Sequence, residues 1–327
     1  MKSKIKWGII GPGNIARKFT SDLKLVDTAS VSAVASRNLE RAQSFADEFQ
    51  IPQVFDSYDS LFASNAVDIV YIATPHNFHK DLAIKAMEKG KHILCEKPLG
   101  INRVEVEEII AAAKQNKVFM MEGLWSRFNP SIKKAKQLVD SGEIGNVSYV
   151  YADFAFYGLD RDEDSRVLNL DLASGSLLDI GIYPIFLAYL ILGMPEEIQA
   201  SSNFHPNGTE IQTSMIFQYP NAQAVLYSGL TSDSKMEAKI SGSQGEIIIP
   251  PRWHEADGYS LVKQKESQKN DLPRTGIGFV HEILEVHDCL INNRLESPLW
   301  THQNSLDLVD LMDTVRRKTG IKFPFET

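Results

Sequence analysis

The chain has 327 residues and a formal net charge of −8, from 34 basic and 42 acidic side chains. This length favours two domains, and 43% hydrophobic with 23% charged residues is a globular balance rather than a disordered or fibrous one. The acidic balance disfavours nucleic acids and anionic membrane surfaces as partners, because both bind basic proteins.

The cysteine count and the apolar runs indicate the cellular environment. Two cysteines, Cys95 and Cys289, are too few for a disulfide framework and favour a reducing, cytoplasmic location. Residues 1–10 lack the apolar core of a secretory signal. The most apolar stretch, residues 180–192, is shorter than the roughly 20 residues of a membrane span. We therefore expect a buried helix there and no membrane partner.

The first third of the chain alternates short apolar runs with amphipathic patterns. Buried strands are predicted at residues 5–10, 31–36, 69–73, 92–95 and 118–121. Helices are predicted between them, at residues 15–23, 39–49, 80–89 and 103–115. Alternation at this spacing predicts α/β structure with a doubly wound parallel sheet, a Rossmann domain over residues 1–124.

The pattern changes in the rest of the chain, residues 125–327. A strand is predicted at 147–157, and helices are predicted at 131–140, 176–193, 278–293 and 302–318. Turn signals at Asn207-Gly208 and Pro220-Asn221 predict hairpins. We expect a C-terminal α+β domain over residues 125–327 with a mainly antiparallel open sheet.

A G-x-G-x-x-A motif follows the first predicted strand. Gly11 permits a tight turn, Gly13 lets the backbone approach a pyrophosphate, and Ala16 allows close helix–strand packing. Asn14 and Ile15 open the helix, whose N-terminus presents free N–H groups to an anion. The alternative is a purely structural turn. The position between a strand and a helix, at the start of a βαβ unit, favours a dinucleotide site.

The end of the second predicted strand indicates which dinucleotide binds. NAD-specific sites usually carry an acidic residue there for the ribose 2′-hydroxyl, whereas this chain has Ser36, Arg37 and then Arg41. Arginine binds phosphate through its bidentate fork. We therefore predict NADP(H). NAD(H) is the alternative, if both arginines are only solvated side chains at a helix start.

Further motifs lie after the later strands. Residues 73–79 read ATPHNFH, 95–98 read CEKP, 122–130 read EGLWSRFNP and 174–183 read SGSLLDIGIY. In this order and spacing the chain resembles the glucose–fructose oxidoreductase / inositol dehydrogenase (Gfo/Idh/MocA) family from residue 5 to about residue 323. Within the family it looks most like the dimeric dihydrodiol dehydrogenases, which also oxidise D-xylose.

The resemblance implies that Lys97 and Tyr183 form the catalytic pair, with Asp179 one turn before the tyrosine. Oxidation of a secondary alcohol requires removal of the hydroxyl proton as hydride leaves carbon. A free tyrosine, with a pKa of about 10, is a poor base at neutral pH, and a cationic lysine lowers the pKa of a neighbouring phenol. Asp179 and Tyr183 are four residues apart and share one helix face.

The roles of Lys97 and Tyr183 are open in two respects. Either Lys97 or Tyr183 accepts the proton. If the pair is not catalytic, Lys97 is a surface lysine and Tyr183 is a tyrosine of the core. The resemblance also implies a cis peptide bond between Lys97 and Pro98.

The resemblance places further residues at the cofactor and the substrate. The residues expected near the cofactor are Thr74, Pro75, His76, His79, Glu96, Lys97, Trp125 and Arg127. The residues expected near the substrate are Trp125, Phe154, Arg166, Trp253 and Phe279. The alternatives are core packing for the aromatic rings, a hydrogen bond at a helix start for His79, and a solvated loop charge for Arg166.

Together these features predict a dehydrogenase that transfers hydride between NADP(H) and a secondary alcohol of a sugar or cyclic diol, of the D-xylose or trans-dihydrodiol type. No metal is expected, because the eight histidines are scattered. The resemblance implies a homodimer formed through the exposed face of the second domain's sheet. The alternatives are an NAD-dependent inositol-type dehydrogenase and a non-catalytic NADP-binding regulator; retention of Lys97, Asp179 and Tyr183 argues against the regulator.

Overall fold

The computed structural model describes residues 4–326, which form two compact units. The first unit combines Met1–Phe128 with Thr275–Leu306, and the second combines Asn129–Arg274 with Asp307–Thr327. The sequence predicts one boundary at residue 124. Packing instead assigns a late segment of the chain to the first unit, because that segment contacts the Rossmann core through its own helix.

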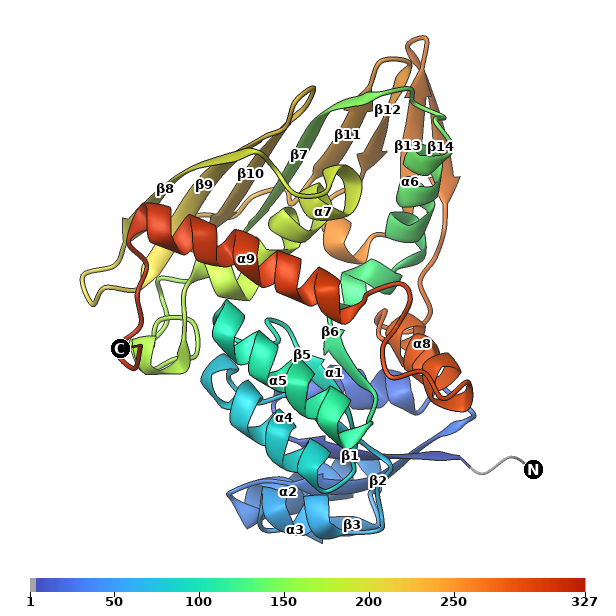
Figure 1. Ribbon diagram of the computed structural model, residues 1–327, viewed down its shortest axis with the longest axis vertical. Helices are drawn as coiled ribbons and strands as arrows, with labels where there is room; N and C mark the ends of the chain where they lie inside the picture. Colours follow the sequence, from blue (N-terminus) through green and yellow to red (C-terminus); the bar gives the residue numbers. More distant parts are fainter. Residues whose placement is uncertain (1–3, 327) are drawn as a thin grey trace. The chain divides into compact units, whose positions relative to one another are not determined.

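The first unit is built on a six-stranded parallel sheet, counted over residues 4–326, with strand order β3-β2-β1-β4-β5-β6 (Figure 1). The strand bounds are β1 (Ile5–Ile10), β2 (Ala29–Ala35), β3 (Gln53–Phe55), β4 (Ile69–Ile72), β5 (His92–Glu96) and β6 (Met120–Gly123). This is the order of a Rossmann fold. Because the strands are parallel, their carboxyl ends all lie at one edge of the sheet.

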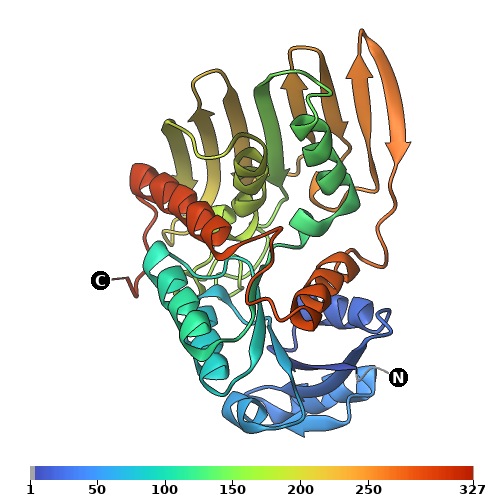
Figure 2. The ribbon, with the colours of Figure 1, turned by 45° about the vertical axis from the view of Figure 1, so that its right-hand side comes forward.

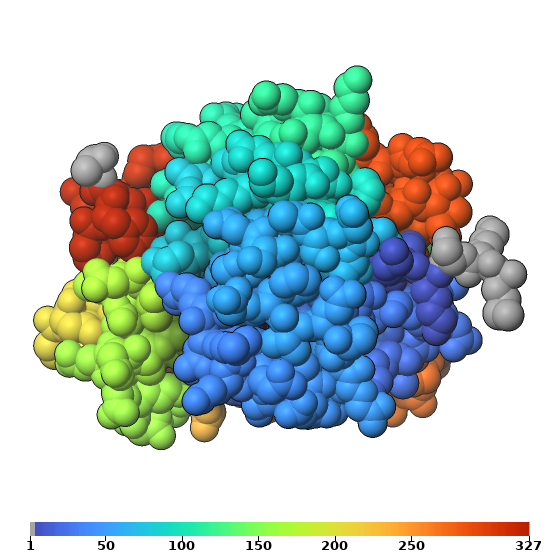
Figure 3. Space-filling view, turned by 90° about the horizontal axis from the view of Figure 1, so that it is seen from below, coloured from blue at the N-terminus to red at the C-terminus, as the bar shows by residue number. Residues whose placement is uncertain are grey.

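The helices of this unit lie close to their predicted positions. Their bounds are α1 (Asn14–Leu23), α2 (Leu39–Phe49), α3 (Tyr58–Ala63), α4 (His79–Glu88), α5 (Arg103–Asn116) and α8 (Val280–Ile291). Figure 3 shows the outer surface of this unit in blue to cyan. The short elements β3 and α3 are not predicted from the sequence, and β6 begins two residues later than expected. The predicted Rossmann architecture is confirmed.

Helix α8 is attached to the first unit by a buried carboxylate. Asp22, at the end of α1, accepts hydrogen bonds from the backbone N–H groups of Ile277, Gly278 and Phe279 at 2.8–3.0 Å. These donors lie in the turn that leads into α8, and Phe279 is the residue before its first turn. A Cβ on Gly276, whose φ is +62°, would lie 2.2 Å from Oδ1 of Asp22. A side chain of α1 therefore fixes the turn before α8, 256 residues later in the sequence.

The second unit is built on an eight-stranded sheet, counted over residues 4–326, with strand order β14-β13-β12-β11-β7-β10-β9-β8. The strand bounds are β7 (Val147–Ala155), β8 (Glu197–Phe204), β9 (Glu210–Gln218), β10 (Gln223–Gly229), β11 (Ala238–Gly242), β12 (Gly245–Ile249), β13 (Gly258–Lys263) and β14 (Glu266–Asp271). Only β7 and β10 pair in parallel within this described sheet. The predicted mainly antiparallel sheet is confirmed.

Helices cover one face of this sheet. Figure 2 shows α6 (Pro130–Asp140) and α7 (Ile182–Leu192) over it, and the long helix α9 (His302–Thr319) begins in the first unit and ends in the second. Along β7, Val150 and Ala152 are buried under α7, while Tyr149 and Tyr151 alternate with them on the opposite face.

The apolar helix predicted over residues 176–193 is interrupted at its start. One turn of π-helix, Leu177–Gly181, precedes α7. By length and composition, Leu170–Leu192 is the one candidate membrane span among residues 4–326, and 78% of its apolar window is buried inside the structure. The prediction of a buried helix is confirmed.

Candidate active site

The glycine-rich motif forms a tight turn between β1 and α1. Gly11 has a φ of +74°, and a Cβ there would lie 2.7 Å from the carbonyl oxygen of Ala73. The N–H of Gly13 donates to the carbonyl of Gly11 at 2.7 Å. A Cβ on Gly13 would meet only the Gly11 carbonyl oxygen, at 3.9 Å. The first glycine is therefore required by the turn, whereas the space beside the second is open.

The start of α1 is suited to bind an anion. Within the described residues no side chain caps this helix, so its first N–H groups are available. Gly13, Asn14 and Ile15 are exposed, while Ala16 is fully buried against the sheet. Free N–H groups and the positive end of the helix dipole can hold a pyrophosphate here.

Two exposed arginines lie at the carboxyl end of β2. The guanidinium of Arg37 lies 5.1 Å from the centre of the Phe78 ring, a cation–π contact. The side chain of Asn38 caps α2 by accepting a hydrogen bond from the N–H of Arg41 at 2.9 Å. The Oγ of Ser36 in turn accepts one from the N–H of Asn38 at 3.2 Å. The local backbone thus fixes the stems of both arginines.

Tyr58, at the start of α3, lies in the electric field of Arg37 and Arg41. Burial raises the pKa of its phenol, while the charges of Arg37 and Arg41 and a hydrogen bond with Arg37 oppose that rise. The side chains of Phe78 and Tyr58 therefore hold Arg37, and a positive field surrounds this end of β2. Such a field can bind a phosphate.

His79 joins the loops after β4 and β5. Its ring is fully buried, with Nδ1 2.8 Å from the carbonyl of Pro98 and Nε2 2.9 Å from the carbonyl of Thr74. Burial lowers the pKa of this imidazole. His79 thus makes hydrogen bonds at a helix start, while the half-buried Pro75 and His76 lie beside it in the same loop.

Lys97 follows β5 in a fixed local environment. Its peptide bond to Pro98 is cis, as the resemblance implies. Its backbone N–H donates to the carboxylate of Glu96 at 3.2 Å, and that buried carboxylate also accepts a hydrogen bond from the hydroxyl of Tyr71. The Lys97 side chain is half-buried. The residues around this lysine hold its backbone firmly at the carboxyl edge of the sheet.

Glu122, at the end of β6, fixes the next loop. Its buried carboxylate accepts hydrogen bonds from the N–H of Leu99 at 3.0 Å, the indole of Trp300 at 3.2 Å and the hydroxyl of Ser305 at 2.7 Å. Burial raises the pKa of Glu122, and these donors and the charge of Lys97 oppose the rise. Glu122 therefore links the loops after β5 and β6 within the first unit.

Trp125 and Arg127 follow that loop. The Trp125 ring stacks on Phe279 with ring centres 4.6 Å apart, and Phe279 is itself almost fully buried. The Nε of Arg127 donates to the carbonyl of Leu299 at 2.8 Å. Both side chains are half-buried and are held by the segment that contains α8.

In the second unit, Asp179 and Tyr183 lie on consecutive turns of one helix. Asp179 is in the π-helical turn and Tyr183 is in the first turn of α7, and each is 6% exposed. Nη1 of Arg166 lies 3.1 Å from Oδ1 of Asp179. Arg166, Asp179 and Tyr183, three of the residues predicted at the catalytic and substrate sites, thus lie close together in this unit.

Aromatic rings surround Tyr183. Its ring centre lies 5.5 Å from that of Phe154 and 5.5 Å from that of His254, and Phe154 stacks on His254 at 4.3 Å. The Trp253 ring meets His254 edge-on with ring centres 6.2 Å apart; it is fully buried, and its indole donates to the carbonyl of Asp153 at 2.9 Å. The ring beside Tyr183 is therefore that of His254, which the sequence argument did not select.

The predicted residues divide between the two units. The candidate cofactor residues lie at the carboxyl edge of the Rossmann sheet, in the loops after β1, β2, β4, β5 and β6. Asp179, Tyr183, Phe154 and Arg166 lie in the second unit. No group of three or more potential metal ligands is found among residues 4–326.

The chain matches two models of one family. Residues 5–124 match the oxidoreductase family with the NAD-binding Rossmann fold (GFO/IDH/MocA), and residues 132–248 match the C-terminal domain of the same family. The protein therefore belongs to the GFO/IDH/MocA oxidoreductases. The predicted resemblance and the prediction of an oxidoreductase are confirmed.

Individual relatives share nearly the full length. Trans-1,2-dihydrobenzene-1,2-diol dehydrogenase of Xenopus tropicalis is 33% identical over 98% of this chain and 99% of the relative, and that of Mus musculus is 33% identical over 98% of each. KijD10, a 3-ketoreductase of Actinomadura kijaniata solved with NADP and TDP-benzene, superposes with a TM-score of 0.88 at 25% identity over 97% of this chain and 98% of the other. The aldose-aldose oxidoreductase of Caulobacter crescentus shares the fold, with a TM-score of 0.89 at 24% identity, over 97% and 98% of the two chains.

Proposed function

We propose that the protein is an NADP(H)-dependent dehydrogenase that oxidises a secondary alcohol of a sugar or a cyclic diol, of the D-xylose or trans-dihydrodiol type. The observation that carries the proposal is the group in the second unit, where Tyr183 lies beside the stacked rings of Phe154 and His254 and one turn after Asp179. The full-length similarity to trans-dihydrodiol dehydrogenases supports the same substrate class.

The first unit fits a dinucleotide. The space beside Gly13 is open, and within the described residues no side chain caps α1, so a pyrophosphate can approach the backbone there. We assign Arg37 and Arg41 to the 2′-phosphate of NADP, because β2 ends without an acidic residue and Phe78 and Tyr58 hold the Arg37 guanidinium. When bound, the oxidised nicotinamide supplies the acceptor for hydride.

The chain's own residues handle the proton. We assign removal of the substrate hydroxyl proton to Tyr183 in its phenolate form or to Lys97 as the neutral amine, and in the first case a cationic lysine would favour the phenolate. Positioned side chains of this kind contribute about 10²–10⁴-fold to proton transfer. Asp179 is held by Arg166 and orients the hydroxyl-bearing end of the substrate.

The aromatic rings suit the apolar face of a sugar or diol ring. Phe154 and His254 present stacked rings next to Tyr183, and such surfaces bind the C–H face of a six-membered ring. We assign Phe154 and His254 to this role in the second unit. In the first unit, Trp125 stacks on Phe279, and we still predict that it contacts the cofactor and the substrate.

A substrate screen tests the proposal. The absorbance of the reduced nicotinamide would be followed with D-xylose, D-glucose, an inositol and trans-1,2-dihydrobenzene-1,2-diol, each with NADP⁺ and with NAD⁺. We expect turnover of D-xylose or the diol, with NADP⁺ preferred. Preferred turnover of the inositol with NAD⁺ would instead identify an inositol-type dehydrogenase. Tight NADPH binding without turnover of any substrate would identify a regulator.

We also propose a homodimer formed through the uncovered face of the second unit's sheet. Tyr151, Val225 and Ile216 are cross-strand neighbours on this face, and Ile216 is 40% exposed. An apolar row on a sheet face is typical of an interface. Val225→Lys places a charge in this row, and light scattering coupled to size-exclusion chromatography should then show monomers. The buried free thiols of Cys95 and Cys289 fit the proposed cytoplasmic location.

A further inference from the structure

The first residue of β9 holds the start of the helix that carries Asp179 and Tyr183. Glu210 is 2% exposed, and its carboxylate accepts a hydrogen bond from the backbone N–H of Leu177 at 2.8 Å and one from the hydroxyl of Ser176 at 2.6 Å. Leu177 is the first residue of the π-helical turn. A buried acidic side chain from the sheet therefore caps the turn that contains Asp179.

The carboxylate is itself fixed from the sheet side. The hydroxyl of Thr213 donates to Oε1 of Glu210 at 2.7 Å. Ser228 lies 2.9 Å from Ser176, and its hydroxyl is the donor in that pair because Ser176 uses its own hydrogen toward Glu210. Thr213 of β9 thus binds the carboxylate itself, and Ser228 of β10 binds the Ser176 hydroxyl that donates to it. Glu210 belongs to β9, so the sheet contributes both the carboxylate and one of the groups that fix it.

Two glycines bring the helix start close to these strands. Gly175 has a φ of +123°, and a Cβ there would lie 3.0 Å from the carbonyl oxygen of Glu210. A Cβ on Gly181 would lie 2.8 Å from the hydroxyl oxygen of Ser228. Larger side chains at either position would push the turn away from the sheet. The close approach therefore depends on glycine at both positions.

The turn before Glu210 also holds the loop that carries Arg166. The side-chain amide of Asn207 and the hydroxyl of Thr209 donate to the carbonyl of Leu168, at 3.0 and 2.7 Å. Leu168 is two residues after Arg166, whose guanidinium binds Asp179. One hairpin therefore contacts both partners of the Arg166–Asp179 ion pair through their neighbouring backbone.

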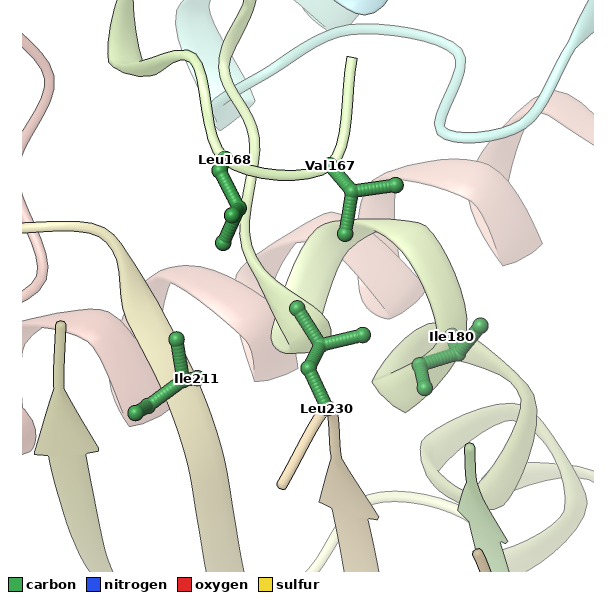
Figure 4. Close-up of a cluster of buried hydrophobic side chains, with 5 residues drawn as sticks. All are labelled: Val167, Leu168, Ile180, Ile211 and Leu230. Carbon is green, nitrogen blue, oxygen red and sulfur yellow. The ribbon is translucent and has the colours of Figure 1, made fainter. Parts of the chain in front are cut away.

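A buried apolar cluster joins four segments of this region (Figure 4). Its members come from the Arg166 loop, the π-helical turn, the start of β9 and the end of β10: Val167, Leu168, Ile180, Ile211 and Leu230. Side chains in such a cluster move little, because close packing resists displacement. The segments that Glu210 connects are therefore also held together by close apolar packing.

We propose that Glu210 is the positioning residue of the catalytic helix: its carboxylate sets the first turn so that Asp179 meets Arg166 and Tyr183 projects beside Phe154 and His254. The inference rests on the proposed function of Asp179 and Tyr183. It assigns Glu210 no contact with substrate or cofactor. Misplacement of a reacting group by about 1 Å costs up to about 100-fold in rate, so loss of this cap should be visible in turnover.

The experiment compares Glu210→Ala and Glu210→Gln with Ile240→Ala, a variant of a fully buried residue of β11 in the same sheet. The full-length enzyme is used throughout. We expect Glu210→Ala to lower kcat with D-xylose or the dihydrodiol by about tenfold or more, with little change in KM and NADPH affinity. Glu210→Gln keeps one acceptor oxygen and should lie between. Ile240→Ala should lower the melting temperature yet keep the wild-type kcat well below that temperature.

A second readout does not depend on the substrate. Hydrogen–deuterium exchange should become faster in the peptide that covers residues 174–183 of both Glu210 variants, and not in that peptide of Ile240→Ala. Wild-type exchange and wild-type kcat in Glu210→Gln and Glu210→Ala would overturn the inference, as would an equal fall of kcat in Ile240→Ala. If Glu210→Ala does not fold, Glu210→Gln decides by the same two criteria. If the wild type oxidises no substrate, the proposed function fails while the exchange data still judge the role of Glu210.

Discussion

Arg166 and Asp179 form an ion pair whose two sides differ in exposure. Nη1 of Arg166 lies 3.1 Å from Oδ1 of Asp179, and 61% of the arginine side chain is exposed against 8% of the aspartate side chain. Solvent screens a pair with one exposed partner, so it contributes at most about 1 kcal/mol to stability. We infer that the pair orients the buried carboxylate rather than stabilising the fold.

The first prediction follows from this contrast. Arg166→Ala should lower kcat/KM by about tenfold, because Asp179 loses its orienting partner, while the melting temperature changes by no more than about 4 °C. Arg161→Ala is the matched control: it removes an arginine of the same loop that stacks on Phe156. Steady-state kinetics and thermal unfolding of both variants are the measurements. Equal kcat/KM in the two variants would refute the orienting role.

The second prediction concerns the proposed proton-transfer residues. Tyr183→Phe and Lys97→Met should each lower kcat by about 10²–10⁴-fold, because each removes a group assigned to proton removal. NADPH affinity, measured by fluorescence titration, should change by less than about threefold in Tyr183→Phe. Tyr189→Phe removes a hydroxyl one to two turns later on α7, where it donates to Asp307 at 2.6 Å, and serves as the control. Wild-type turnover in both Tyr183→Phe and Lys97→Met would sink the assignment.

The cofactor half of the chain is readable from the sequence for a physical reason. Buried parallel strands appear as continuous apolar runs, and their carboxyl ends meet at one edge of the sheet. The motifs after residues 10, 35, 72, 96 and 123 therefore had to lie close together. Short or exposed elements carry no such signal: β3 has three residues, and β14 is exposed along almost its whole length, so neither shows a hydrophobic pattern.

The substrate half is harder to predict because single residues change roles with local backbone geometry. Arg252 has a φ of +62°, and the short turn after it buries Trp253 and places His254 against Phe154 and Tyr183. In the unfolded sequence the tryptophan is the more obvious candidate for an aromatic wall, because only the folded turn shows which ring lies beside Tyr183. Glu210 was missed for a related reason: a lone acidic residue at a strand start has no pattern, and only the folded sheet shows which helix it caps.

The third prediction separates two glycines of the dinucleotide motif. Gly13→Ala should leave the fold intact, because a Cβ there has open space, yet weaken NADPH binding by about tenfold or more by blocking approach of the pyrophosphate. Gly11→Ala should destabilise the protein itself, since the residue has a positive φ and a Cβ would clash with the Ala73 carbonyl. Thermal unfolding without cofactor and calorimetric titration with NADPH measure the two effects. A large loss of melting temperature in Gly13→Ala would contradict the expected difference.

The fourth prediction concerns the choice between NADP and NAD. Arg37→Ala should raise the dissociation constant of NADPH by about tenfold or more and leave that of NADH within about twofold, because only NADPH carries the 2′-phosphate. Arg294→Ala removes an exposed arginine of the same unit that binds Asp288, and should change neither constant. Equal weakening of both cofactors in Arg37→Ala would mean that the arginine does not contact the phosphate.

A buried histidine of α8 gives the fifth prediction its structural basis. Nε2 of His287 accepts a hydrogen bond from the Trp7 indole at 3.0 Å, so Nε2 carries no proton and Nδ1–H is the donor to the Thr28 hydroxyl at 2.8 Å. Protonation of the ring would place an N–H against the indole N–H. Burial correspondingly lowers the pKa of His287 to about 4.

The sign of the pH dependence follows from that shift. The unfolded chain binds a proton at His287 below about pH 6.5, whereas the folded chain does so only below about 4, so the stabilising contribution is complete above pH 6.5 and is lost as the pH falls toward 4. His287→Gln cannot titrate, so its melting temperature should fall less steeply than that of the wild type between pH 6.5 and 4. If the melting temperatures of the two proteins fall equally steeply over that pH range, His287 does not link protonation to the attachment of α8.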